Sequence, residues 1–282
     1  MVFMFNKAQI EISFNWVFVL VAGAAILVLF YNVISFETDA TSDQLGRTVM
    51  ERMSIVLSSY ESSVDSVRIS TTPFNRLLIF SCGIDGHRFS LENSVGSVHL
   101  EQDLLFSPPR VGESRLISWS TVLNVPYPVG RVTFLVDNMT HYNFSNDAKY
   151  YFDLFPGEIS KSLNYVPPGF RDVINIDVTG DDLVVNGVEY EGIDIDVLKM
   201  GFIITGDEDL FNCTMDKIQE RTRAINKVYY NRTYELNESV SITFYHQVLP
   251  IFEEEEIPSP ANRNELASVN DLLRNRNLPR IY

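Results

Sequence analysis

Cysteine, histidine and basic residues are all scarce in this chain. Its 282 residues include two cysteines, four histidines, and 22 lysine and arginine residues against 37 aspartate and glutamate residues. Cys82 and Cys213 lie far apart and neither belongs to a CxxC pair, which argues against a structural zinc site. The net charge of −15 repels phosphate groups. The composition therefore argues against nucleic acid as a partner.

Motifs of the common catalytic sites are also missing. The sequence has no HExxH, GxSxG, GxxxxGK[ST] or GxGxxG, and no two histidines stand four residues apart on an expected helix. The acidic loops around Gly180 and Gly206 do not follow the EF-hand spacing, and carboxylates of that kind are ordinary in turns. We therefore predict no enzymatic activity, no cofactor and no metal site.

Charge is absent from one long N-terminal stretch, Ile12 to Phe36. At about 1.5 Å per residue, a helix of this length crosses a hydrocarbon core about 30 Å thick. We therefore predict a transmembrane helix over residues 9–36. Residues 37–72 contain apolar side chains at spacings of three and four, which predicts an amphipathic stalk helix. The alternative is two separate helices with a break near Phe36.

The residues that precede this stretch, Lys7-Ala8-Gln9-Ile10, are followed by the acidic Glu11. Together with the apolar run they resemble the class III signal of archaeal type IV pilin-like proteins. The resemblance covers residues 7–36 and implies cleavage between Ala8 and Gln9 by a prepilin peptidase, with residues 1–8 as the leader. The alternative is an uncleaved membrane anchor.

The resemblance also implies a way of assembly, in which hydrophobic helices bundle in a filament core. The bacterial pattern places Glu at the fifth mature position, which here is Ser13, so the register role of the acidic residue is not carried over directly. The residues that the resemblance assigns to helix packing are Glu11, Phe14, Trp16, Gly23 and Ala24.

Flanking charge predicts the orientation in the membrane. Lys7 is the only basic residue before the apolar run, and acidic residues follow it until Arg47. The positive-inside rule then places the N-terminus in the cytoplasm and the C-terminal domain outside. Sequons for N-glycosylation all follow the run, at Asn138, Asn143, Asn212, Asn231 and Asn237. In this setting Cys82 and Cys213 either form a disulfide or remain two isolated buried thiols.

Beyond the stalk we expect an α+β head domain over residues 73–252, with a mixed, largely antiparallel sheet. Asp85-Gly86 and Asn186-Gly187 are hairpin turn signals. Helices are expected over 147–163 and 213–238, the second packed on the head. Strands are expected over 76–80, 87–91, 115–125, 131–136, 172–178, 183–190, 193–205 and 240–252. Residues 253–282 are expected to be an acidic linker and a C-terminal tail.

These features predict a membrane-anchored extracytoplasmic structural or adhesion protein. As a pilin-like protein it would be a minor filament subunit or a surface protein, with the membrane and other pilin-like subunits or copies of itself as partners. The alternative is a single-pass ectodomain that binds a ligand or protein without forming filaments. A membrane-tethered hydrolase with an unrecognised site is a third reading.

Overall fold

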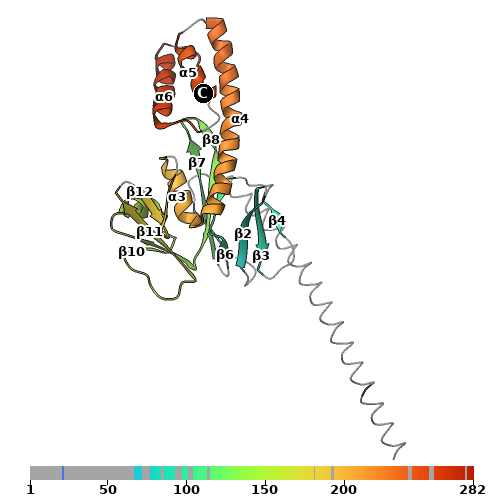
Figure 1. The fold of residues 1–282 in the computed structure, drawn as a ribbon, viewed down its shortest axis with the longest axis vertical. Helices are drawn as coiled ribbons and strands as arrows, with labels where there is room; N and C mark the ends of the chain where they lie inside the picture. The colour runs from blue at the N-terminus through green and yellow to red at the C-terminus, as the bar shows by residue number, and fades with distance from the viewer. Residues whose placement is uncertain are drawn as a thin grey trace, which may run out of the picture. The chain divides into compact units, whose positions relative to one another are not determined.

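A computed structural model (Figure 1) describes Val21 and residues 67–71, 77–83, 86–92, 97–100, 104–112, 115–180, 182–191, 194–240, 243–253, 257–276 and 278–282. The chain divides into two units, Met1–Val49 and Met50–Tyr282, and every described residue except Val21 lies in the second unit. The leader and helix-packing residues, Lys7 to Ala24, lie outside the described residues.

Three sheets form the second unit. The first has the order β1-β7-β8-β5, the second β4-β3-β2-β6 and the third β10-β9-β11-β12-β13. In the first sheet these strands are Arg68–Thr71, Arg115–Asn124, Pro128–Asp137 and Leu105–Phe106. In the second sheet they are Val98–His99, Gly86–Leu91, Leu77–Gly83 and Arg110–Gly112. In the third sheet they are Lys161–Leu163, Thr140–Phe144, Asp172–Thr179, Asp182–Val185 and Val188–Glu189.

Local turn chemistry explains the tight hairpins. β11, β12 and β13 are antiparallel neighbours, and the β12–β13 turn is Asn186-Gly187. Both turn residues have positive φ, 51° and 83°, which Asn and Gly tolerate best. The hairpin β2–β3 pairs antiparallel as expected. The parallel pairs are β10–β9, β9–β11 and β5–β8, so the third sheet is mixed.

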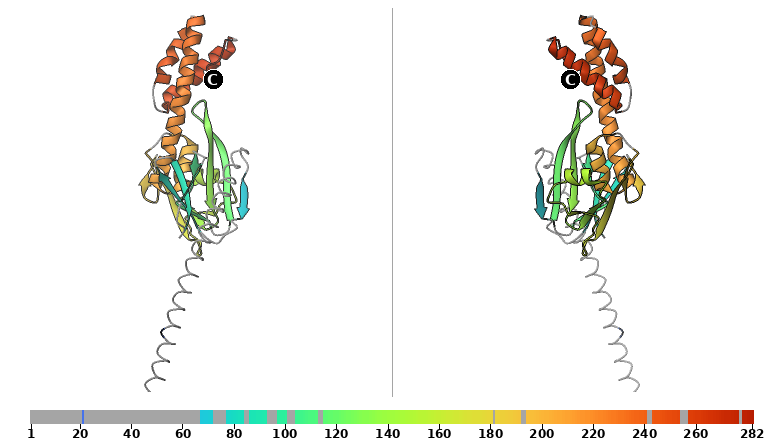
Figure 2. Two further views of the ribbon diagram at one scale, coloured as in Figure 1. Left: turned by 90° about the vertical axis from the view of Figure 1, so that its right-hand side faces the viewer. Right: turned by 90° about the vertical axis from the view of Figure 1, so that its left-hand side faces the viewer.

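Among the described residues one helix lies between β9 and β10 and the others follow β13. They are α2 (Lys149–Leu154), α3 (Asp196–Thr205), α4 (Glu208–Val240), α5 (Thr243–Glu253) and α6 (Pro260–Asn275). With 33 residues, α4 is about 50 Å long. It contacts strands of the first two sheets and also α5, and α5 contacts α6. Figure 2 shows these last helices beside the far part of α4, near the end of the β7–β8 hairpin.

Aromatic side chains fill much of the core. Phe106 stacks on Phe134 and on Phe211, with ring centroids 5.9 and 5.6 Å apart. α3 lies against the same ring at Gly201, where an added Cβ would come within 2.6 Å of Phe106. A second aromatic cluster joins the hairpin residue Tyr127 to Tyr229, Phe252 and the C-terminal Tyr282.

The predicted fold class is wrong for the described residues. Among them, no helix is both long and apolar enough to span a bilayer. The described part is instead a mixed α/β arrangement of three sheets with helices at the C-terminal end. The expected strands over 193–205 and 240–252 are the helices α3 and α5. The helix expected over 213–238 is confirmed within the longer α4.

The C-terminal residues belong to the folded unit rather than to a loose tail. Ser259 caps α6 by accepting a hydrogen bond from the backbone N–H of Asn262 at 3.2 Å. Ile281 is fully buried, and its N–H donates to Asn270 Oδ1 at 3.0 Å. The hydroxyl of Tyr245 donates to the carbonyl of Pro279 at 2.7 Å. The expected boundary at 252/253 coincides with the end of α5 and does not end the fold.

Candidate functional site

The carboxylate of Asp137, at the end of β8, is fully buried and has bonding partners on several elements. Its Oδ1 accepts from the backbone N–H groups of Met139 and Thr140 at 3.1 and 2.8 Å and from the Thr140 hydroxyl at 2.8 Å. Its Oδ2 accepts from Gly112 N–H at 2.8 Å and from Arg171 Nη2 at 2.7 Å. A buried carboxylate is stable only with partners of this kind.

Arg171 connects the Asp137 carboxylate to the second and third sheets. Its Nε donates to Asp172 Oδ2 at 2.6 Å, and its Nη2 also donates to the carbonyl of Arg110 at 3.1 Å. Burial alone would lower the pKa of Arg171, but its bonds to Asp172 and Asp137 outweigh that effect and raise it. The Asp137–Arg171 cluster therefore ties β6 of the second sheet to β8 of the first and to the start of β11 in the third.

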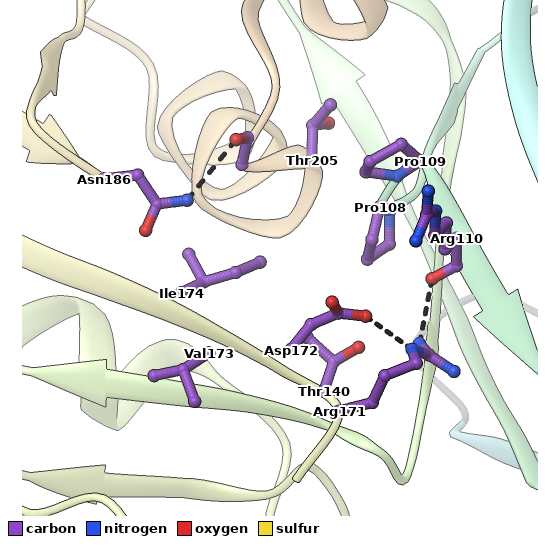
Figure 3. A pocket seen from close by; sticks show the side chains of 11 residues that line it. Pro108, Pro109, Arg110, Thr140, Arg171, Asp172, Val173, Ile174, Asn186 and Thr205 are labelled. Carbon is purple, nitrogen blue, oxygen red and sulfur yellow. Dashed lines mark hydrogen bonds and ion pairs between the residues drawn. The ribbon is translucent and has the colours of Figure 1, made fainter.

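A cavity of about 340 Å³ lies beside the Asp137–Arg171 cluster (Figure 3). Most of its polar atoms already have protein partners. Asn186 Nδ2 donates to the carbonyl of Gly206 at 3.5 Å, and Thr205 Oγ1 donates to the carbonyl of Gly201 at 2.8 Å. The remaining lining is apolar at Pro108, Pro109, Val173 and Ile174 and also includes the side chain of Arg110. The cavity therefore lies where the second and third sheets meet the end of α3.

A second connection between distant elements is the disulfide that joins Cys82 of β2 to Cys213 of the helix α4, with Cα atoms 5.9 Å apart. The strand partner of Cys82 is His87, whose Nε2 lies 2.8 Å from Thr214 Oγ1. The Thr214 hydroxyl donates its proton to the carbonyl of Leu105 at 2.7 Å, so the imidazole Nε2–H must be the donor to Thr214. We call this group (Cys82, Cys213, His87 and Thr214) the disulfide clamp.

His141 has a serine hydroxyl beside each of its ring nitrogens. Its Nδ1 lies 2.9 Å from Ser160 Oγ and its Nε2 2.8 Å from Ser162 Oγ. Burial lowers its pKa, against an opposing effect of the Tyr165 carbonyl. Within the described part of the chain no carboxylate bonds the imidazole, so a Ser-His-Asp arrangement is not present around it. The ring instead packs on Phe170, with centroids 4.7 Å apart.

The expected glycosylation acceptors occupy different environments. Asn212 and Asn231 are exposed on α4, whereas Asn138, Asn143 and Asn237 are half-buried. In the sequons of Asn212 and Asn231 the threonines, Thr214 and Thr233, are fully buried. An enzyme that reads both the asparagine and the hydroxyl therefore cannot engage these two sequons on the folded helix.

Sequence reasoning missed the Asp137–Arg171 cluster. Asp137 is the last residue of β8 and is followed by Asn138. Asp and Asn at the start of a turn commonly bond the next backbone N–H groups, so the sequence did contain a local signal for this carboxylate. Arg171 had none, because it reaches Asp137 across 34 residues of chain.

Comparison with known proteins adds no relative. No protein-family model, no curated protein sequence and no solved structure matches the chain.

Proposed function

We propose that the chain is a membrane-anchored extracytoplasmic structural protein of pilin-like type, acting as a minor filament subunit or as a surface protein. The observation that carries this proposal is the disulfide between Cys82 and Cys213. Structural disulfides persist in oxidising compartments and are rare in the cytosol. This matches the orientation expected from the charges around the uncharged stretch Ile12 to Phe36.

A structural role is supported by how the buried polar groups are used. The Asp137 carboxylate accepts five hydrogen bonds, and both ring nitrogens of His141 face hydroxyls. Groups held in this way stabilise the fold. The partners that follow are the membrane and other subunits of the same kind.

Mass spectrometry of the native protein from a membrane fraction tests the proposal. We expect a mature N-terminus at Gln9, and a mass that rises by two hydrogens on reduction as Cys82 and Cys213 are released. Recovery from the cytosol with both thiols free would contradict it.

The same sample separates the filament role from the ectodomain alternative. Cross-linking of intact cells is expected to give ladders of the chain with itself or with other processed subunits. An intact Met1 and a detergent-soluble monomer would instead favour a single-pass ectodomain that binds a ligand without a filament.

A further inference from the structure

The outer face of the third sheet carries a shallow hollow of about 330 Å³ formed by β9, β11 and β12. Side chains alternate along these strands, as strand geometry requires. Tyr142, Phe144, Ile174 and Ile176 point to the core and are buried. The opposite face carries the polar side chains of Asn143, Asn175 and Asp177. The lining of the hollow also includes Ser145, Asn164, Val184, Gly187 and the strand residue Ile176. Figure 1 labels β11 and β12 of this sheet.

Hydrogen bonds hold the polar side chains of the hollow in fixed orientations. Asn143 and Asn175 are direct partners across β9 and β11, and Asn143 Nδ2 donates to Asn175 Oδ1 at 3.0 Å. Asn143 Oδ1 accepts from the backbone N–H of Tyr165 at 3.1 Å. These bonds fix the planes of both amides, which removes part of the entropy cost of binding a ligand.

Several hydrogen-bonding atoms remain open to a ligand. Among the described residues nothing bonds Asn175 Nδ2 or the side-chain amide of Asn164, whose backbone N–H donates to the carbonyl of Phe144 at 2.8 Å. Asp177 uses Oδ1 to accept from Val178 N–H at 2.8 Å, which leaves Oδ2 as an acceptor. The hollow therefore offers two amide groups and one carboxylate oxygen within a small area. Adjacent hydroxyls on a sugar ring need such a mixture of donors and acceptors.

An exposed aromatic residue, Tyr165, follows the lining residue Asn164 in the chain and is not itself part of the lining. Tyr165 directly follows Asn164 and is 61% exposed, although its backbone is bonded to Asn143. Asn164 has a positive φ of 52°, which turns the chain at this point. A large exposed ring on an anchored backbone presents an apolar face at little entropy cost, and the C–H face of a pyranose can pack on it.

We propose that this hollow binds a neutral oligosaccharide, through the amides of Asn164 and Asn175, the carboxylate of Asp177 and the ring of Tyr165. The negative charge of the hollow and of the chain favours neutral over acidic sugars. Among the described residues of the lining Asp177 is the only charged one, and the chain as a whole has a net charge of −15, so acidic sugars are repelled. A calcium-dependent site is disfavoured because calcium takes about six to eight oxygens, and the described residues contain no group of three metal-ligating side chains.

The proposed sugar site goes beyond the structural role and does not depend on membrane attachment. It also bears on the sequon at Asn143, because a glycan would be attached to Nδ2, the atom that donates to Asn175 Oδ1 in the hollow. Asn143 is therefore a positioning residue of the binding site and not an acceptor.

Saturation-transfer NMR and calorimetry on the full chain, held in a detergent without a sugar headgroup, test the proposal. The probes are the neutral trisaccharides maltotriose, mannotriose and chitotriose, and the acidic trigalacturonate. We expect at least one neutral trisaccharide to bind and trigalacturonate not to bind. Asn175→Ala and Tyr165→Ala are each expected to weaken binding about tenfold, because each removes one contact of the size of a hydrogen bond or more.

Thr179→Ala is the matched control, since Thr179 is exposed on the same strand but does not line the hollow. It should bind like the unmodified chain, and circular dichroism should show all three variants folded. The proposal is overturned if no neutral trisaccharide binds, if trigalacturonate binds equally well, or if neither Asn175→Ala nor Tyr165→Ala weakens binding.

Discussion

At the scale of single residues, Asp137 and Asp172 show how burial determines the contribution of an ion-paired carboxylate to stability. Both pair with Arg171, at 2.7 and 2.6 Å, but the side chain of Asp137 is 0% exposed and that of Asp172 is 41% exposed. Water screens the second pair, whereas loss of Asp137 would remove the buried acceptor of the Gly112 and Thr140 N–H groups and of Arg171 Nη2.

We therefore predict that Asp137→Ala lowers the free energy of unfolding by about 3–5 kcal/mol, whereas Asp172→Ala lowers it by about 1 kcal/mol or less. Urea unfolding followed by circular dichroism measures both values. Equal losses for the two variants would show that the Asp137–Arg171 cluster does not hold the three sheets together.

At the scale of helices and strands, the sequence predicted most elements whose boundaries are set locally. The Asn186-Gly187 turn and the helix around Cys213 to Glu238 depend on neighbouring residues, and both are present. α3 and α5 were mistaken for strands because a short apolar run looks the same in a buried strand and in a buried helix. The contact that packs α3 against the core joins Gly201 to Phe106, and these two residues are far apart in the sequence.

That contact gives a prediction for α3. Gly201→Ala places a Cβ within 2.6 Å of the Phe106 ring, which is closed in by Phe134 and Phe211, so the helix or the ring must shift. Overpacking of this kind costs about 1–3 kcal/mol, which exceeds the gain in helix propensity of roughly 1 kcal/mol at most. Gly157→Ala, with nothing within 4 Å, is the matched control and should change stability little. Thermal unfolding compares them, and an unchanged or raised midpoint for Gly201→Ala would refute the packing argument.

At the scale of the whole molecule, the candidate site was harder to predict than the elements. Asn143 and Asn175 lie 32 residues apart and meet only because β9 and β11 are parallel neighbours in this register. A shift of β11 by one residue would turn the Asn175 side chain to the core face and separate it from Asn143. Nothing local in the sequence marks that pairing, so the hollow emerges only from the assembled sheet.

The disulfide clamp also affects the whole molecule. Its cysteines are 131 residues apart, and the loop between them contains most of the described strands together with α2 and α3. Closing so long a loop restricts the unfolded chain, and we predict a loss of about 3–5 kcal/mol of unfolding free energy on reduction. For a domain of this size the corresponding fall in Tm is roughly 10 °C.

Cys82 is exposed at the surface, so dithiothreitol can reach the bond without prior unfolding. The double variant Cys82→Ser/Cys213→Ser should already show the lowered Tm and should not respond to dithiothreitol. If the unmodified protein melts at the same temperature with and without reductant, the clamp contributes nothing to stability, and the three sheets and α4 are held together by packing and by the Asp137–Arg171 cluster alone.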